Sequence, residues 1–166
     1  MNESLFMDRI PPQNIEAEQA VLGAILLDGD ALVTAMERVT SDDFYRGAHQ
    51  RIYEAMIEIA EANEPVDLIT LTARLQDKKQ LEEVGGISYL SELANAVPTA
   101  ANVDYYAQIV EEKSMLRRLI RAATQIVTNG YSGEDEVGSC SAMRSSASWR
   151  FHRPAPAPAS LRSRMC

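Results

Sequence analysis

The chain has 166 residues, of which 46% are hydrophobic, 6% aromatic and 24% charged, and its net charge is −8. This length suits one domain with at most a small appendage, and it allows a sizeable core. Because residues 138–166 hold five Arg and no acid, residues 1–137 carry a net charge of −13, so we expect no strong direct DNA binding. A partner with a basic face is favoured instead.

The positions of the cysteines and the lack of a long apolar run indicate the cellular compartment of the protein. Cys140 and Cys166 both lie near the end of the sequence, so no disulfide framework and no metal-ligand spacing is present. The sequence has no signal-like segment and no apolar run of about 18 residues. We therefore expect a cytoplasmic protein that does not associate with membranes.

The rest of the chain is organised around residues 10–27. Pro11 and Pro12 cannot donate backbone hydrogen bonds, which a helix tolerates only in its first turn. A helix is therefore predicted over about residues 12–27, with Asn14 as a candidate N-cap.

This first helix is predicted to be the central post of an all-helical domain. Glu16 and Glu18 place negative charge near the positive end of its dipole. From Ala20 onward it is apolar on nearly every face, which predicts burial on more than one side. Gly23 costs roughly 1 kcal/mol relative to Ala inside a helix, so a second helix is expected to approach closely at this point.

Four shorter helices are predicted next, at about 31–39, 47–62, from 68 onward, and 87–96. Their apolar positions recur at helical spacing and are expected to be buried: Leu32, Val33, Met36, Val39, Ile52, Tyr53, Met56, Ile59, Ala60, Leu68, Leu71, Leu75, Leu90 and Leu93. Gly29 suits a left-handed position after a helix, and Asp30 and Asp67 are candidate N-caps. Residues 66–72 also fit a strand, but the strong cap and the lack of a partner strand favour a helix.

A long helix is predicted over about 100–129, after Pro98 and Thr99. Apolar and amphipathic positions recur there every seven residues, in one series at Tyr106, Lys113, Ile120 and Val127, and in another at Ile109, Leu116 and Ala123; a flanking row holds Glu112, Leu119 and Ile126. This is the pattern of a coiled-coil seam. About 30 residues of helix span about 45 Å, longer than the preceding domain should be wide. We therefore predict that the helix projects and pairs with a returning helix, with another copy of the chain, or with both. The alternative is a core helix of the same domain.

Composition changes abruptly after Val137. Of the 29 residues at 138–166, 20 are Ser, Ala, Arg or Pro, and the proline-rich run 154–158 forbids a regular helix. We expect this tail to be disordered, and we interpret it as out-of-frame translation. A returning helix would then be missing, which predicts exposed apolar surface along residues 109–127.

The motif Pro-Pro-x-x-x-Glu-Ala-Glu-Gln-Ala-Val-Leu-Gly-Ala at residues 11–24 resembles the opening signature of bacterial replicative DNA helicases of the DnaB family. The resemblance extends over about residues 5–137 and is nearest to Bacillus-like homologues. It rests further on Asp43-Phe44-Tyr45 with His49 and Ile52, on Pro65-Val66-Asp67, on Gly85-Gly86 with Tyr89, Leu90 and Leu93, on Pro98 with Asn102 and Tyr106, and on Val110, Glu112, Arg117, Leu119 and Ile120.

The resemblance implies an all-α fold: a small orthogonal bundle of five to six helices at 1–98, the first arm of a helical hairpin at 99–137, and the tail at 138–166. In this family the amino-terminal domain forms the collar of a hexameric ring and assembles subunits. It also implies primase and a helicase loader as partners in DNA replication.

The family's motor is not recognisable in this sequence. Its phosphate-binding signature, Gly-x-x-x-x-Gly-Lys-Ser/Thr, is absent. We therefore expect no enzymatic activity and no cofactor in this chain, since ATP and Mg²⁺ belong to the motor domain of the family.

Candidate sites are protein contacts only. The partner-facing residues expected from the long helix and from the resemblance are Glu16, Tyr89, Tyr106, Ile109, Leu116, Leu119, Ile120 and Ile126. No catalytic, cofactor or metal residues are predicted, because His49 is the only histidine before the tail and adjacent acids on a helix do not face one another. Arg117, Arg118 and Arg121 are expected to pair with Glu111, Glu112 or a facing arm. A rival reading is a free-standing acidic helical adaptor or regulator.

Overall fold

The computed structural model describes residues 9–132, and within that range every regular element is helical. The elements are α2 (Ile15–Leu27), α3 (Ala31–Met36), the 3₁₀ helix η1 (Ser41–Asp43), α4 (Gly47–Glu61), α5 (Leu68–Asp77), α6 (Gly86–Ala94) and α7 (Val103–Ser132). The predicted all-α fold is confirmed. The predicted tail at 138–166 lies outside the described residues.

The chain divides into two compact units, residues 1–122 and 123–166. The first unit holds the helices α2 to α6 and most of α7. The second is described over residues 123–132, where α7 continues.

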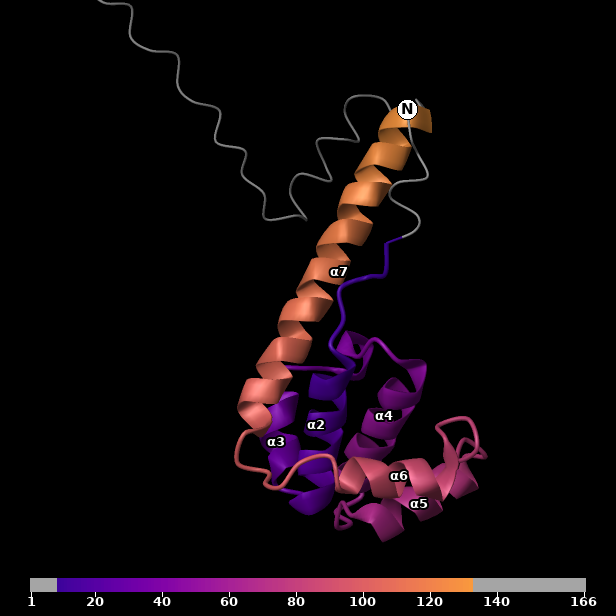
Figure 1. The fold of residues 1–166 in the computed structure, drawn as a ribbon. Helices are drawn as coiled ribbons and strands as arrows, with labels where there is room; N and C mark the ends of the chain where they lie inside the picture. Colours follow the sequence, from indigo (N-terminus) through magenta and orange to yellow (C-terminus); the bar gives the residue numbers. More distant parts are fainter. Residues whose placement is uncertain (1–8, 133–166) are drawn as a thin grey trace, which may run out of the picture. The chain divides into compact units, whose positions relative to one another are not determined.

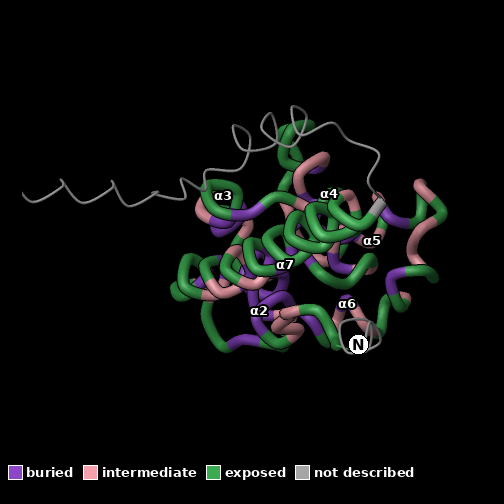
Figure 2. The backbone as a smooth tube through the Cα atoms, turned by 90° about the horizontal axis from the view of Figure 1, so that it is seen from above, coloured by how far each residue is buried: buried purple, intermediate pink, exposed green. Residues whose placement is uncertain are grey.

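Helix α2 is the central post of the first unit, lying between α3 and α4 (Figure 1) and coloured largely as buried in Figure 2. Asn14 caps it as predicted: its Oδ1 accepts the backbone N–H of Ala17 at 2.9 Å. The expected close approach at Gly23 is also confirmed. A Cβ placed there would lie 2.3 Å from the backbone oxygen of Leu93 on α6. Two helix backbones therefore meet where only glycine leaves room.

The connection between α2 and α3 differs from the prediction. Among the described glycines only Gly85 and Gly86 have positive φ, so Gly29 is not left-handed. Asp30 makes no side-chain cap bond; instead its N–H donates to Asp28 Oδ1 at 3.0 Å. The tight turn is closed by a side chain preceding the glycine rather than by the glycine's own conformation.

Two of the shorter helices bury a set of residues that differs from the prediction. Helix α3 ends at Met36 instead of residue 39, and it packs through one side only, so Val33 and Met36 are exposed. On α4 the predicted Ala60 is exposed, whereas Ala55 is buried together with the other predicted core residues of this helix. In both cases the apolar residues that lie off the buried side of the helix remain exposed.

Asp67 decides the helical state of residues 68–77. Its Oδ1 accepts the N–H groups of Ile69 at 2.9 Å and Thr70 at 2.8 Å, and Thr70 Oγ1 accepts the N–H of Asp67 in return. This reciprocal capping box satisfies donors that a helix start leaves unpaired. Leu71 and Leu75 are then fully buried, so the preference for a helix over a strand was correct.

The first part of α7 belongs to the core of the first unit. Its buried residues recur every three or four positions, at Val103, Ala107, Val110, Ser114 and Arg117. This stripe is apolar at its start and polar at its end. After Arg117 no described residue of α7 is buried.

Candidate protein-interaction surface

Helix α7 carries a second apolar face, opposite the stripe that meets the core. We call it the outer face of α7 and define it by Leu116, Leu119 and Ile120, which are 44%, 41% and 50% exposed. At 3.6 residues per turn, the centres of the outer face and of the buried stripe lie about 150° apart around the helix. Contact with the core therefore leaves the outer face open.

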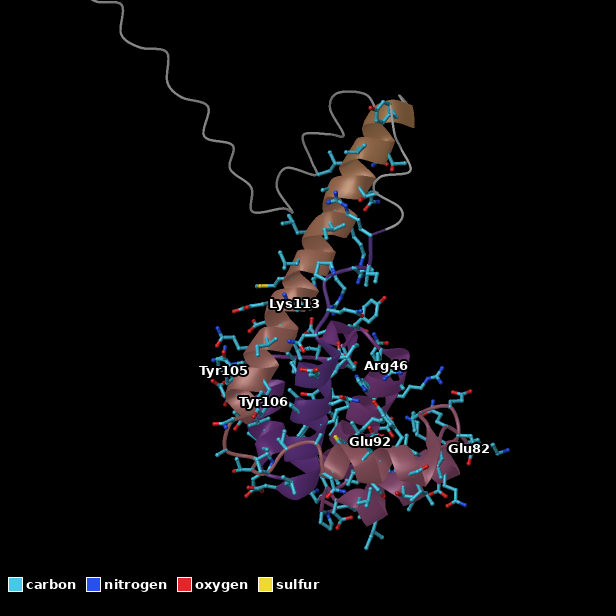
Figure 3. The ribbon with its side chains drawn as sticks, in the orientation of Figure 1. Arg46, Glu82, Glu92, Tyr105, Tyr106 and Lys113 are labelled. Carbon is cyan, nitrogen blue, oxygen red and sulfur yellow. The ribbon has the colours of Figure 1, made fainter. Side chains whose placement is uncertain are left out.

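The sequence-predicted partner residues on α7 fall into two groups. Tyr106 and Ile109 are half-buried and pack against the core. Leu116, Leu119 and Ile120 form the outer face, and in the second unit Ile126 is also exposed. Figure 3 labels Tyr105, Tyr106 and Lys113 along the same helix. Exposed apolar surface was predicted over 109–127; within that range Ile109 is half-buried and Val110 buried, and the exposed large apolar residues begin at Met115.

Tyr89, on α6, is anchored by its hydroxyl. That oxygen lies 2.7 Å from His49 Nε2, and it accepts from Gln19 Nε2 at 3.2 Å and from Arg46 Nη1 at 3.4 Å. The Arg46 guanidinium also lies 6.0 Å from the centre of the Tyr89 ring. The tyrosine is half-buried, so its ring is held in one place at the surface.

The buried carboxylate of Glu18 lies next to His49, which contacts Tyr89. From the sequence, Glu18 was expected only to compensate the dipole of α2. Glu18 is 1% exposed and His49 is fully buried, and Glu18 Oε2 lies 2.6 Å from His49 Nδ1. Glu18 Oε1 accepts the N–H of Tyr45 at 2.6 Å, just before α4 begins. An Nδ1–H that donates to Glu18 leaves Nε2 free to accept the Tyr89 hydroxyl proton, which satisfies each group. The sequence features that could have indicated the Glu18–His49 pair are a carboxylate that lies among buried alanines of α2 and the single histidine before the tail.

Glu16, predicted as a partner residue, is exposed two residues before Glu18 of this cluster. Its neighbour Glu18 points inward and Glu16 outward, although both lie in the first turn of α2. The structure therefore leaves Glu16 accessible and gives Glu18 a structural role.

An open hollow of about 420 Å³ lies beside Tyr89. Arg46, Glu82 and Glu92, labelled in Figure 3, contribute to its lining. Gly85, with φ of 111°, lies against Tyr89, and a Cβ there would come within 2.8 Å of the tyrosine Cβ. Within residues 9–132, Glu82 and Glu92 have no ion pair, so this part of the surface is acidic.

The arginines of α7 do not pair as predicted. Arg38 on the segment after α3 takes Glu111 and Asp104, and its guanidinium holds the pKa of Asp104 below the usual value. Arg117 and Arg118 turn to Asp43 instead of Glu111 or Glu112. The side chains of the long helix reach Asp43 on the short helix η1 across a separation of 74 and 75 residues, a proximity that no local spacing encodes.

Within residues 9–132, no three or more His, Cys, Asp or Glu side chains are grouped so that they could hold a metal ion, and none of the helices has the length and apolar character needed to cross a membrane.

The fold defines the class first: an all-helical domain with a buried central helix, closed by one long helix with a second apolar face. Comparisons with known proteins then place it. The family model described as "DnaB-like helicase N terminal domain" matches residues 10–112. This chain belongs to that family.

The relatives agree with the expected resemblance to Bacillus-like homologues. The chain is 66% identical over 133 residues to the replicative DNA helicase DnaB of Geobacillus stearothermophilus, covering 80% of this chain and 29% of the relative. It thus spans less than a third of that helicase's length.

Two solved structures share the fold. The crystal structure of the N-terminal domain of DnaB helicase from Mycobacterium tuberculosis is 43% identical with a TM-score of 0.79, over 82% of this chain and 96% of that one. A DnaB-like replicative helicase, described with its interactions with primase, is 31% identical with a TM-score of 0.66, over 78% of this chain and 30% of that one.

Proposed function

We propose that this chain acts as a collar domain of a replicative DNA helicase: it assembles subunits and docks primase, and it has no ATPase or unwinding activity of its own. The observation that carries the proposal is the outer face of α7. Leu116, Leu119 and Ile120 form an apolar row on a helix whose opposite side is already satisfied by the core. Contiguous exposed apolar surface of this kind typically marks a protein interface.

Assembly with a second copy of the chain is the occupant that the pattern favours for the outer face. The seven-residue recurrence of apolar positions is the signature of a helix that packs along another helix, and a copy supplies a matching seam. Two acidic bodies would repel at long range, so the contact has to rest on apolar burial.

Primase docking is proposed from the neighbouring structure and from the surface around Tyr89. One structural relative is a DnaB-like helicase described with its interactions with primase. In this chain the Tyr89 ring is fixed at the surface beside Glu82 and Glu92, which form no ion pair among residues 9–132, and Glu16 is accessible. These groups offer a rigid aromatic contact with acidic neighbours, which suits a partner with basic side chains.

A helicase loader is proposed as a third partner, on the family relationship alone. The motor that would bind ATP and Mg²⁺ belongs to the full-length family members, and bacterial replication places the proposed function in the cytoplasm.

The assembly proposal is tested by sedimentation equilibrium of the full chain. The unchanged protein is expected to self-associate, and the double variant L116S/L119S to be monomeric. The matched control is I69S, which replaces an 80% exposed apolar residue on α5 and should associate like the unchanged chain. Equal association of L116S/L119S and the unchanged protein would contradict an interface at the outer face.

The docking proposal is tested by biolayer interferometry with the primase of Geobacillus stearothermophilus. Y89A should weaken binding at least about tenfold, a typical cost of removing an anchoring aromatic side chain. Y89F keeps the ring and should bind nearly as well, and I69A should bind normally. A self-associating chain that does not bind primase would favour the rival reading, an acidic adaptor without a motor.

A further inference from the structure

The buried stripe of α7 ends in a polar cluster whose purpose the core does not explain. Arg117 is 6% exposed, Ser114 is 3% exposed and Asp43 on η1 is 5% exposed. Burying an arginine and a carboxylate is costly unless every group is satisfied, and apolar residues would close the same gap more cheaply. The cluster therefore calls for a reason other than stability.

Arg117 connects three separate segments of the first unit. Its Nη1 donates to the backbone oxygen of Pro12 at 2.8 Å, and its Nη2 donates to the backbone oxygen of Asp43. The guanidinium carbon lies 5.7 Å from the centre of the Tyr45 ring. Pro11 and Pro12 restrict the backbone before α2, which presents the Pro12 oxygen in a fixed place. The proline pair of the sequence signature thus supplies an acceptor for the long helix.

The Asp43 carboxylate holds the same helix through two other side chains. Oδ1 accepts from Ser114 Oγ at 2.6 Å and from Arg118, while Oδ2 accepts from Thr40 N at 2.8 Å and Thr40 Oγ1 at 3.0 Å. Both oxygens are therefore fully used, one toward α7 and one toward the body. We call Asp43, Ser114 and Arg117 the α7 clamp.

The hydrogen bonds of the clamp can fix the rotation of α7 about its own axis, which the apolar stripe cannot do. Apolar contacts are non-directional, so Val103, Ala107 and Val110 would tolerate some rotation of α7 about its own axis. Hydrogen bonds weaken steeply away from linear geometry, so the clamp accepts one rotation only. The clamp lies at the end of the buried stripe, next to Leu116 and Leu119 of the outer face.

We propose that Arg117 and Asp43 are positioning residues that fix the rotation of α7 against the body, and so set the direction in which the outer face meets a partner. The rotational part stands on the clamp geometry alone. Only its consequence for assembly rests on the proposed function.

Pulsed electron–electron resonance between two spin labels tests the rotational part. The labels are attached to cysteines replacing exposed Glu54 on α4 and Glu112 on α7, in a full chain whose Cys140 and Cys166 are changed to serine, diluted with unlabelled protein. R117M removes the guanidinium and should broaden the distance distribution about twofold. R117K should restore part of the narrow distribution, because its ammonium can donate to one of the two carbonyls at a time.

R121M is the matched control, because it makes the same change one turn further along the same helix. Arg121 is exposed and has no hydrogen bond or ion pair within residues 9–132, so its variant should keep the distribution of the unchanged chain. If R117M does not fold, as judged by circular dichroism, S114A carries the same test by removing one bond of the clamp. A narrow distribution unchanged in a folded R117M or S114A would overturn the proposal.

The consequence for assembly is measured separately by sedimentation equilibrium. R117M leaves the outer face intact, yet its self-association should weaken about tenfold relative to R121M. If the unchanged chain does not self-associate, the proposed function fails while the spin-label result still decides the clamp. If R117M broadens the distance distribution but associates normally, the clamp positions the helix without directing assembly.

Discussion

The contact at Gly23 makes the sharpest quantitative prediction about this fold. Gly23→Ala adds one methyl group 2.3 Å from the Leu93 backbone oxygen, whereas non-bonded carbon and oxygen atoms need more than 3 Å. That oxygen cannot rotate away, because it belongs to α6 and already accepts the N–H of Ala96 at 3.0 Å. The two helices must therefore separate, and backbone shifts of this kind in a well-packed core are destabilising.

The magnitude follows from two opposing effects. Overpacking a core typically costs about 1–3 kcal/mol. Replacing glycine by alanine inside a helix returns up to about 1 kcal/mol. The net expectation is a loss of about 1–2 kcal/mol in the free energy of unfolding, or about 0.5–1 M in the urea midpoint for a domain of this size.

The assay is urea unfolding of the full chain followed by circular dichroism at 222 nm. Gly47→Ala is the matched control, since Gly47 begins α4 and a Cβ there would meet nothing within 4 Å. Its midpoint should stay the same or rise. If G23A were as stable as the unchanged protein while G47A behaved as expected, the two backbones would not be in the contact described, and the reasoning from the glycine would be refuted.

Three further predictions concern polar groups. Asp67→Ala removes the cap of α5 and should cost about 1 kcal/mol in urea unfolding, whereas Asp67→Asn should retain most of the stability. His49→Ala leaves Glu18 buried without its partner and should cost about 3–5 kcal/mol, with His49→Gln recovering part of the loss; a cost below about 1 kcal/mol would contradict the buried pair. The pKa of Asp43 lies below its usual value, because hydrogen bonds from Ser114 and Thr40 and the charge of Arg118 outweigh the effect of burial. A lowered folded pKa stabilises the fold above the unfolded pKa of about 3.9 and loses that contribution as pH falls through the folded value. The urea midpoint should therefore drop as the pH falls below about 4, and less steeply in Asp43→Asn.

Helix α7 has two apolar faces, and the clamp explains why only one of them packs against the core. On sequence alone, the positions around Tyr106 and Ile109 belong to the same seam as Leu116, yet the structure half-buries the first two and exposes the third. The seven-residue pattern indicates that one helix packs against two surfaces. The pattern does not indicate at which residue of α7 the contact with the core ends.

Local chemistry was enough to predict several elements from the sequence. Asn14 and Asp67 cap the helices they were expected to cap, because capping involves atoms only two or three residues apart. The close approach at Gly23 was also predictable, since a glycine inside an apolar helix needs a reason of this kind. The DnaB-family resemblance was specific for the same reason: it consists of short motifs in a fixed order.

What only the tertiary structure decided is which polar groups meet across large separations in the chain. The partners of Glu18 are Tyr45 and His49, those of Arg117 are Pro12 and Asp43, and neither set could be chosen from spacing. A helix dipole or a nearby acid offers each charged side chain a local partner of modest value. The buried contact prevails because desolvated groups must be satisfied completely, and only the packing of the helices in the folded domain shows which groups are desolvated.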